Sequence, residues 1–191
     1  MNQSNWQRRL IGIENAPPAK AYRSMKKHVP EVHSELRSRS VVVPEVIYNC
    51  SGINILNRRI KSLMFTTDVA LIPNCNAQAI MAVYPFTPQL TVTKAILEVA
   101  AVPCFVGVGG GTTGGQRAVH LALQAELLGA YGVVVNAPMT NEDIAAISDV
   151  VDIPVLATIG SLYDDIEGKI RAGATILNVS GGKDTPELVK K

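Results

Sequence analysis

A glycine-rich segment in the middle of the chain has the residue types and spacing of an anion-binding turn. Gly109, Gly110, Gly111, Thr112 and Thr113 directly follow an apolar run. Glycine lets backbone N–H groups approach a ligand closely, and a helix that starts after the turn adds the positive end of its dipole. We expect these residues to bind a phosphate or carboxylate. Tight packing of the helix on the strand is the alternative use of the same glycines.

The spacing also matches G-x-G-x-x-G, the pattern of dinucleotide-binding turns. In such sites an acidic residue about 20 positions further on binds the ribose. Here the next apolar run ends in Asn136-Ala137-Pro138, without a carboxylate. The turn is therefore interpreted as a phosphate or carboxylate site rather than a nicotinamide dinucleotide site, and we expect no cofactor.

A second glycine turn lies near the end of the sequence. Ser180, Gly181 and Gly182 supply a hydroxyl and two small residues, and Lys183 follows with an ammonium group. We expect the first three to bind an anion and Lys183 to pair with it. An exposed loop lysine is the alternative, because lysine is seldom buried.

Three polar residues at the ends of other apolar runs complete the candidate catalytic set with Lys183. Asp68 would act as a general base or accept hydrogen bonds from substrate hydroxyls. It fits a helix cap equally well. Asn136 and Asn178 both donate and accept hydrogen bonds, which suits a hydroxyl, an amide or a polarised carbonyl. Turn formation is the alternative use of the two asparagines.

Other chemistries find no support in the sequence. His120 lies on the expected solvent face of a helix, and His28 and His33 lie near the N-terminus. No Ser-His-Asp, H-E-x-x-H, P-loop or zinc spacing occurs. The three cysteines are widely separated and lie in or beside apolar segments, as is usual for buried thiols. We therefore expect no metal site and no conventional hydrolase mechanism.

Alternating strands and helices must position these residues. Short runs that are apolar at consecutive positions predict strands of a parallel sheet covered on both faces. The predicted strands are 60–66, 79–84, 102–108, 132–136, 154–158 and 175–179. The predicted helices are 68–75, 88–100, 116–128, 142–150, 163–172 and one that starts at residue 186.

Six such units predict an α/β fold of the TIM (β/α) barrel type, in which ligands bind above the carboxyl ends of the strands. The residues that close the strands, Thr66, Tyr84 and Thr158 among them, should meet there. A closed barrel has eight units over about 200 residues or more, so either the last two units are missing, which we expect, or the sheet stays open. We expect an N-terminal extension over residues 1–42, partly disordered or helical, and a C-terminally incomplete barrel over 43–191. A hairpin of 45–50 and 53–55 around Ser51-Gly52 should cover one end of the sheet.

Seven segments carry a resemblance to known proteins. They are VPEVIYNCSG (43–52), RRIKSL (58–63), FTTD (65–68), AVYPFTPQ (82–89), GVGGGT (107–112), NAP (136–138) and LNVSGGK (177–183). Through them the chain from about Met25 to Lys191 resembles a family of bacterial α/β-barrel proteins labelled "hydrolase". The resemblance implies a TIM barrel with two further βα units.

Composition limits the partners. The chain has 191 residues, a formal net charge of +2, 47% hydrophobic residues and 18% charged residues. This is enough for one sizeable core, and the near-neutral charge does not suit wrapping of nucleic acid. No apolar run has the length of about 20 residues that a membrane-spanning helix needs. We expect a cytoplasmic protein without a membrane or nucleic-acid partner.

Two hypotheses of function follow. The first is an enzyme that acts on a small anionic metabolite, phosphorylated or carboxylated, by lyase, aldolase or isomerase chemistry or as the family's hydrolase label implies. The second is a non-catalytic sensor or regulator that binds such a metabolite, which the lack of a strong acid–base pair favours. The open edge of an incomplete barrel also predicts pairing with another copy, so we expect a homo-oligomer.

Overall fold

The protein is described by a computed structural model that covers residues 30, 32, 34 and 40–191. The chain divides into two compact units, residues 1–36 and 37–191, and every helix and strand named below belongs to the second unit. The predicted N-terminal extension, with its disorder or helix, lies largely outside the described residues. Its boundary at residue 42 stays a prediction.

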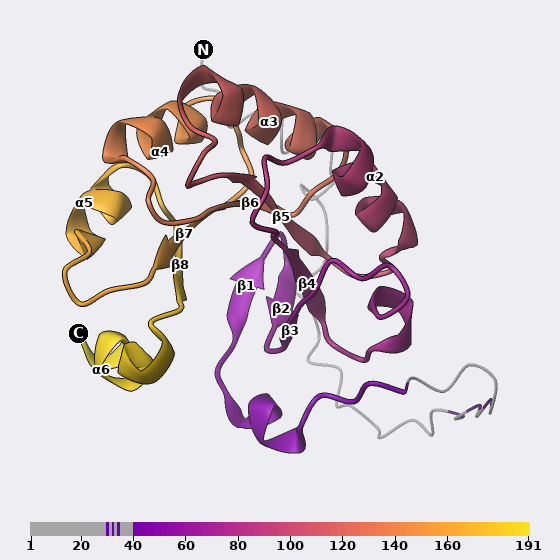
Figure 1. The fold of residues 1–191 in the computed structure, drawn as a ribbon. Helices are drawn as coiled ribbons and strands as arrows, with labels where there is room; N and C mark the ends of the chain where they lie inside the picture. The colour runs from indigo at the N-terminus through magenta and orange to yellow at the C-terminus, as the bar shows by residue number, and fades with distance from the viewer. Residues whose placement is uncertain (1–29, 31, 33, 35–39) are drawn as a thin grey trace, which may run out of the picture. The chain divides into compact units, whose positions relative to one another are not determined.

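Six parallel strands form one curled sheet, in which each strand pairs with the next along the chain. Helices cover its convex face (Figure 1). This is the fold of a TIM-type barrel with six of its eight strands, so the predicted fold class and all six predicted strands are confirmed. The strands are β3 (Leu63–Phe65), β4 (Ala79–Ala82), β5 (Cys104–Gly109), β6 (Gly132–Val135), β7 (Val155–Ile159) and β8 (Ile176–Val179).

Helices follow the strands because their apolar residues recur on one face. In α3, Ala118, Ala122 and Ala125 are spaced by four and three residues and are fully buried. Their small side chains let α3 lie close to β5. The helices are α2 (Leu90–Val99), α3 (Gly115–Leu127), α4 (Asn141–Ser148), α5 (Ile166–Arg171) and α6 (Thr185–Lys190). All five were predicted, with boundaries that differ by up to three residues.

The helix predicted at 68–75 is wrong. Only one 3-10 turn forms there, η4 (Ile72–Asn74), after a turn in which the N–H groups of Leu71 and Ile72 donate to the Asp68 carbonyl oxygen at 3.1 Å. Pro73 has no N–H group and cannot donate to a carbonyl four residues earlier. The α-helical hydrogen-bond ladder is therefore interrupted in the middle of the segment.

The hairpin exists and contains the predicted strand 53–55, but its partner strand and its turn differ from the prediction. It consists of β1 (Ile53–Ile55) and β2 (Arg58–Ile60), which pair antiparallel. Leu56 and Asn57 form the turn with φ angles of 46° and 63°, the left-handed conformation that two-residue hairpin turns require. Residues 45–49 form a 3-10 helix instead, η3 (Glu45–Asn49).

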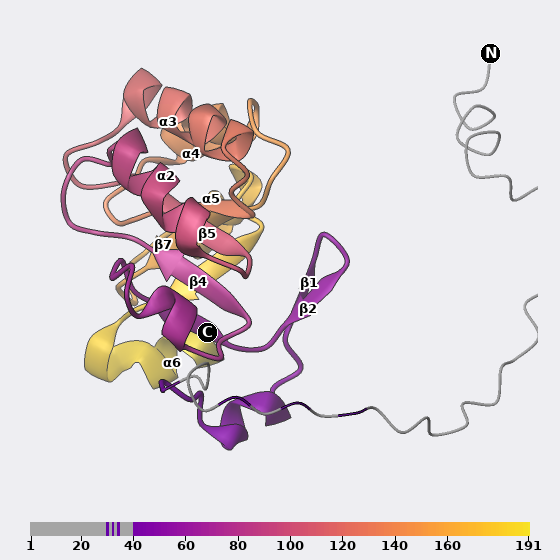
Figure 2. The ribbon, with the colours of Figure 1, turned by 90° about the vertical axis from the view of Figure 1, so that its right-hand side faces the viewer.

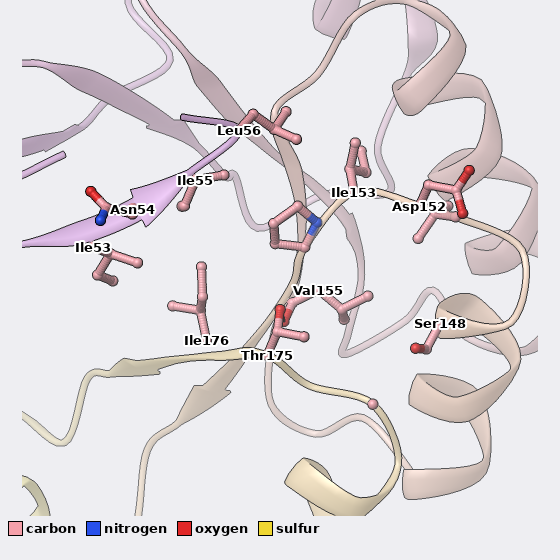
Figure 3. Close-up of a pocket in the computed structure, with 13 residues that line it drawn as sticks. Ile53, Asn54, Ile55, Leu56, Ser148, Asp152, Ile153, Val155, Thr175 and Ile176 are labelled. Carbon is pink, nitrogen blue, oxygen red and sulfur yellow. The ribbon is translucent and has the colours of Figure 1, made fainter. Parts of the chain in front are cut away.

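The hairpin packs against the concave face of the sheet at the ends where the strands begin. Its Ile55 and Ile60 join a buried cluster with Met81, Phe105 and Leu156 from the sheet. The hairpin lies within the curve of the sheet in Figure 1 and at one end of it in Figure 2. Figure 3 shows the pocket that remains between the hairpin and the first residues of β7 and β8, about 500 Å³ in volume. The hairpin therefore covers the amino end of the barrel and leaves the carboxyl end open.

Candidate functional site

A cleft of about 470 Å³ lies where the strands end. Its walls come from the segments after β4, β5, β6, β7 and β8, so strands far apart in the sequence build it together. We call it the carboxyl-end cleft. Six predicted site residues line it, namely Gly109, Gly110, Gly111, Thr112, Asn136 and Ser180. The other six do not: Asp68, Thr113, Asn178, Gly181, Gly182 and Lys183.

A chain of hydrogen bonds joins three polar side chains at the ends of adjacent strands. The Asn178 side-chain nitrogen donates to the Thr158 hydroxyl at 3.1 Å, and this hydroxyl donates to Asn136 Oδ1 at 3.0 Å. Since Asn136 Oδ1 accepts this bond, its Nδ2 group is left as a donor on a residue that lines the cleft. Asn178 thus acts on the cleft through Thr158 and not directly.

Strand periodicity explains why these three residues face the barrel interior. Side chains two residues apart lie on the same face of a strand. Val134 and Leu156 are buried in the inner cluster, and Ile176 packs against it. Asn136, Thr158 and Asn178 follow these apolar residues at a distance of two positions. The inner face therefore changes from an apolar layer to a hydrogen-bonded polar layer at the carboxyl end.

Two hydrogen bonds close the first glycine turn, and a third ties it to the loop after β6. Gly110 N donates to the Thr113 carbonyl at 2.8 Å, Gly111 N to the Pro138 carbonyl at 3.3 Å, and Thr113 N to the Gly110 carbonyl at 3.2 Å. Thr112 is the residue of this turn whose N–H donates to no acceptor in the described part of the chain. The anion-binding role of the turn stays a prediction, and it now rests mainly on Thr112.

Close approach explains two of the glycines. Gly110 has a φ of +115°, and a Cβ there would collide with the backbone oxygen of Asn136. Gly109 has no room for a Cβ beside Met139 and Ala118, so it serves helix-on-strand packing. Gly111 has a φ of +59° but faces open space. Glycine is therefore required at these positions by backbone conformation or by packing, independently of any ligand in the cleft.

The positive end of α3 is already capped by a carboxylate. Asp143 Oδ1 accepts the N–H of Gly115, the first residue of α3, at 3.0 Å. The anion-binding prediction counted on this helix end for attraction. Because Asp143 offsets part of its positive charge, attraction for a ligand anion at this point is weakened.

Three further aspartates after strand ends also accept backbone N–H groups, and one of them, Asp165, caps a helix. Asp68 Oδ1 accepts from Ala70 N at 2.8 Å, and Asp164 Oδ2 accepts from Gly160 N at 2.7 Å and Ser161 N at 3.0 Å. Asp165 Oδ1 accepts from Gly168 N at 2.9 Å and caps α5. The bond from Gly168, and then the one from the Asn141 side chain, lower the pKa of Asp165. Asp68 therefore stabilises a local turn and caps no helix, and its catalytic role stays a prediction.

Lys183 lies in η5 (Gly182–Asp184), where it is exposed and forms no ion pair with a described residue. Gly181 N donates to the Thr185 hydroxyl at 3.0 Å, and a Cβ on Gly181 would collide with Leu188 of α6. The second glycine turn thus brings α6 close to the sheet. Its binding role, like that of Lys183, stays a prediction.

Sequence analysis missed two side chains near the cleft. Phe86 lines it and is 74% exposed, and only its place in an aromatic and proline-rich loop could have indicated this. Lys169 of α5 is buried, and its Nζ donates at 3.1 Å to the Met139 carbonyl in the loop after β6. Lys169 therefore ties α5 to a loop beside the cleft, a contact that no local pattern predicts.

The cysteines differ in environment. Cys75 and Cys104 are buried and Cys50 is exposed. Burial raises the pKa of Cys104 to about 11, which makes its thiol a poor nucleophile. Across the described residues, no group of three or more His, Cys, Asp or Glu side chains is placed to hold a metal ion.

No helix within the described residues is both long and apolar enough to cross a membrane. The expected cytoplasmic location and the expected lack of a nucleic-acid partner stay predictions.

Comparisons with known proteins support the fold. No protein-family model matches the chain, and no curated protein matches it. A phosphonopyruvate hydrolase solved with oxalate and Mg²⁺ is similar in structure, with a TM-score of 0.54, 15% identity, and coverage of 69% of this chain and 62% of that chain. A Pseudomonas aeruginosa protein described as a candidate dihydrodipicolinate synthetase gives a TM-score of 0.47, 20% identity, and coverage of 60% and 50%.

These structures are TIM-barrel enzymes, and the chain spans about half to three fifths of their length. At such low identity, the TM-score of 0.54 shows a shared fold and carries no information about a shared activity. The class that fold and cleft define is therefore the TIM barrel, with an open cleft at its carboxyl end.

Proposed function

We propose that this protein is a TIM-barrel enzyme that binds a small carboxylated or phosphorylated metabolite in the carboxyl-end cleft. The observation that carries the proposal is the hydrogen-bond chain from Asn178 through Thr158 to Asn136, which leaves the Asn136 amide as a donor. The Ser180 hydroxyl and the Thr112 N–H are further neutral donors on lining residues. Oxygen atoms of a carboxylate or phosphate accept hydrogen bonds from such groups.

The reaction that suits this arrangement is of the lyase, aldolase or isomerase kind. Negative charge develops on a substrate oxygen in these reactions, and a preorganised amide donor stabilises it. The resemblance to the bacterial family labelled "hydrolase" adds hydrolysis as a further class. In either case Asp68 is proposed to transfer protons and Lys183 to pair with the substrate anion.

A sensor or regulator is the second candidate, and one observation favours it. Among the described residues that line the cleft, Tyr84 is the only one with a titratable side chain. Its hydroxyl accepts a hydrogen bond from Gln89 N at 2.7 Å, so it also has a structural partner. A cleft lined by neutral donors can bind a metabolite without transforming it.

Binding is tested by calorimetric titration with oxalate, the small dicarboxylate found with the phosphonopyruvate hydrolase. Asn136→Asp replaces the free amide by a carboxylate, and like charge should weaken oxalate binding about tenfold or more. Asn54→Asp is the matched control, because Asn54 is exposed on the hairpin at the opposite end. An equal loss of affinity in both variants would contradict the proposal.

Turnover separates the two candidates. Asp68→Asn should keep oxalate affinity and abolish turnover of a metabolite that the intact protein transforms. If the intact protein transforms no member of a panel of small phosphorylated and carboxylated metabolites, while oxalate still binds, the sensor is correct.

We further propose that the protein is a homo-oligomer. The outer strands β3 and β8 each pair on one side only. Phe65 of β3 is 64% exposed, and all four residues of β8 are only half-buried, whereas β4, β5 and β6 are buried throughout. Pairing with a second copy would bury these edges. A stable monomer in native mass spectrometry at low concentration would rule this out.

A further inference from the structure

Another cavity lies at the amino end of the barrel, on the side of β4 and β5, and is distinct from the pocket of Figure 3 beside β7 and β8. Its volume is about 500 Å³, and we call it the amino-end pocket. Strand β2 of the hairpin forms one wall, and the residues just before β4 and β5 form the rest. Its polar lining residues are Arg58, Arg59, Asn76 and Gln78, and no carboxylate lines it.

The two amides of this pocket have fixed orientations. Asn76 Oδ1 accepts from Val43 N at 2.7 Å, and Gln78 Oε1 accepts from Lys61 N at 2.7 Å. A backbone N–H can only bind the oxygen of a carboxamide, so the nitrogen of each amide is turned away from that contact. Neither side-chain nitrogen donates to another described residue. Both half-buried amides therefore keep free N–H donors.

The guanidinium groups are also held without a counter-charge. Arg59 Nε donates to the Ser51 carbonyl at 2.7 Å, which leaves its terminal nitrogens free. The Arg58 guanidinium lies 5.8 Å from the centre of the Tyr131 ring, a distance typical of a cation–π contact. The ion pairs of the described chain, Lys94–Glu98, Arg171–Glu167 and Lys190–Glu187, include neither arginine.

We propose that the amino-end pocket binds the phosphate group of a small phosphorylated molecule. Two oriented amides offer hydrogen-bond donors, while their oxygens are occupied. Arg58 and Arg59 also line the pocket, but they are exposed and consecutive in β2, so their side chains leave opposite faces of the strand and reach the pocket from two sides. Arginine suits this ligand because its planar fork of donors matches phosphate oxygens, and charge-assisted bonds are about twice as strong as neutral ones. Ile60 and Pro103, which also line the pocket, can contact a non-polar part of the ligand.

Inorganic phosphate is the probe, and side-chain amide signals in a ¹H–¹⁵N correlation spectrum are the direct readout. Phosphate should shift the NH₂ signals of Asn76 and Gln78 in the full chain, and leave that of Asn54 unchanged. In parallel, Arg58→Gln combined with Arg59→Gln should weaken phosphate binding about tenfold or more, measured by calorimetry. Arg171→Gln, which removes an exposed and paired arginine, is the matched control and should bind as the wild type.

Three results would overturn the proposal: unshifted Asn76 and Gln78 signals at saturating phosphate, wild-type affinity in the double variant, or an equal loss in Arg171→Gln. If the double variant does not fold, Arg59→Lys keeps the charge without the fork and should still lower the affinity. Asn136→Asp separates this pocket from the carboxyl-end cleft, because it should leave the shifts of Asn76 and Gln78 intact even if the proposed function fails.

Discussion

The two ends of the barrel differ in how their charged side chains are partnered. Helices that follow parallel strands begin at the carboxyl end, where their first N–H groups lack partners and attract carboxylates. Cations gather at the amino end on and beside β2, where Arg58 and Arg59 form no ion pair within the described chain and the Lys61 ammonium donates to the Tyr48 carbonyl at 2.6 Å. The aspartates that cap backbone N–H groups after strands are Asp68, Asp143, Asp164 and Asp165.

This difference shows what glycine turns and helix starts do not decide. They predict that an anionic ligand binds at the carboxyl end. There, the N-terminal end of α3 at Gly115 already has the carboxylate of Asp143 as its partner. Two arginines without an ion pair in the described chain, Arg58 and Arg59, lie at the other end, whereas the exposed Lys183 of the carboxyl end does not line the cleft. The residues that line the carboxyl-end cleft can therefore select a ligand by the geometry of neutral donors, whereas those of the amino-end pocket can also select by charge. Binding in the pocket should accordingly be the more sensitive of the two to added salt.

The largest effect is expected from the apolar layer that separates the two ends. Phe105→Ala should lower the free energy of unfolding by about 3–5 kcal/mol, because Phe105 is 1% exposed in the inner cluster and its loss leaves a cavity. Phe86→Ala makes the same change at an exposed cleft residue and should stay within about 0.5 kcal/mol. Denaturant titration measures both. Similar values for the two variants would show that the inner layer is not packed as described.

The next largest effect is a difference in stability loss between alanine substitutions at two glycines of the same turn. Gly110→Ala combines a positive φ with a collision against Asn136 and should cost about 3 kcal/mol. Gly111→Ala has the strained φ alone, with open space for its Cβ, and should cost about 1 kcal/mol. Denaturation of both variants checks this order. A larger loss for Gly111→Ala would mean that Gly111, and not Gly110, is the residue packed against Asn136, so that the cleft is lined differently from this description.

Sequence patterns sufficed for the sheet, because buried parallel strands are apolar at consecutive positions. They failed where a turn lacks its usual residues. Leu56-Asn57 makes the hairpin turn without glycine, so Ser51-Gly52 attracted the prediction instead. Pro73 could have warned against the helix at 68–75, but the apolar residues around it suggested continuity.

The sequence allowed us to predict which residues lie at the strand ends, but not which distant residues they would contact. Asn136 was found because it ends a strand, and the structure places it at the cleft. The capping of Gly115 by Asp143 joins residues 28 positions apart, and no local pattern encodes such a contact. The amino-end pocket went unnoticed for the same reason, because its arginines and amides come from separate segments that line one pocket only in the fold.

A smaller effect should separate the ends through the hydroxyl of Thr158. Thr158→Val removes the link between Asn178 and Asn136, and should weaken oxalate binding in the carboxyl-end cleft about fivefold, because Asn136 loses its fixed orientation. Thr158→Ser keeps the hydroxyl and should retain the affinity, while both variants lose about 1 kcal/mol of stability. Phosphate binding at the amino end should not change. Equal oxalate affinities for Val and Ser would mean that the chain does not orient Asn136.

The smallest effect concerns the carboxylate caps themselves. Hydrogen bonds from Gly168 and Asn141 lower the pKa of Asp165 in the folded protein. The unfolded chain, with a pKa near 3.9, therefore binds the proton more readily than the folded protein. The stability that Asp165 contributes is fully present above about pH 4 and is lost as the pH falls through the lower folded pKa.

Asp165→Asn should thus flatten the acid side of the stability profile, followed by denaturant titration from pH 6 down to the lowest pH at which the protein refolds. Asp149→Asn is the matched control, because Asp149 is exposed and its side chain makes no hydrogen bond with a described residue. Its profile should follow the wild type. If both variants behave alike, the carboxyl end is not held by its carboxylates, and the contrast in charge between the ends would then have no consequence for stability at the carboxyl end.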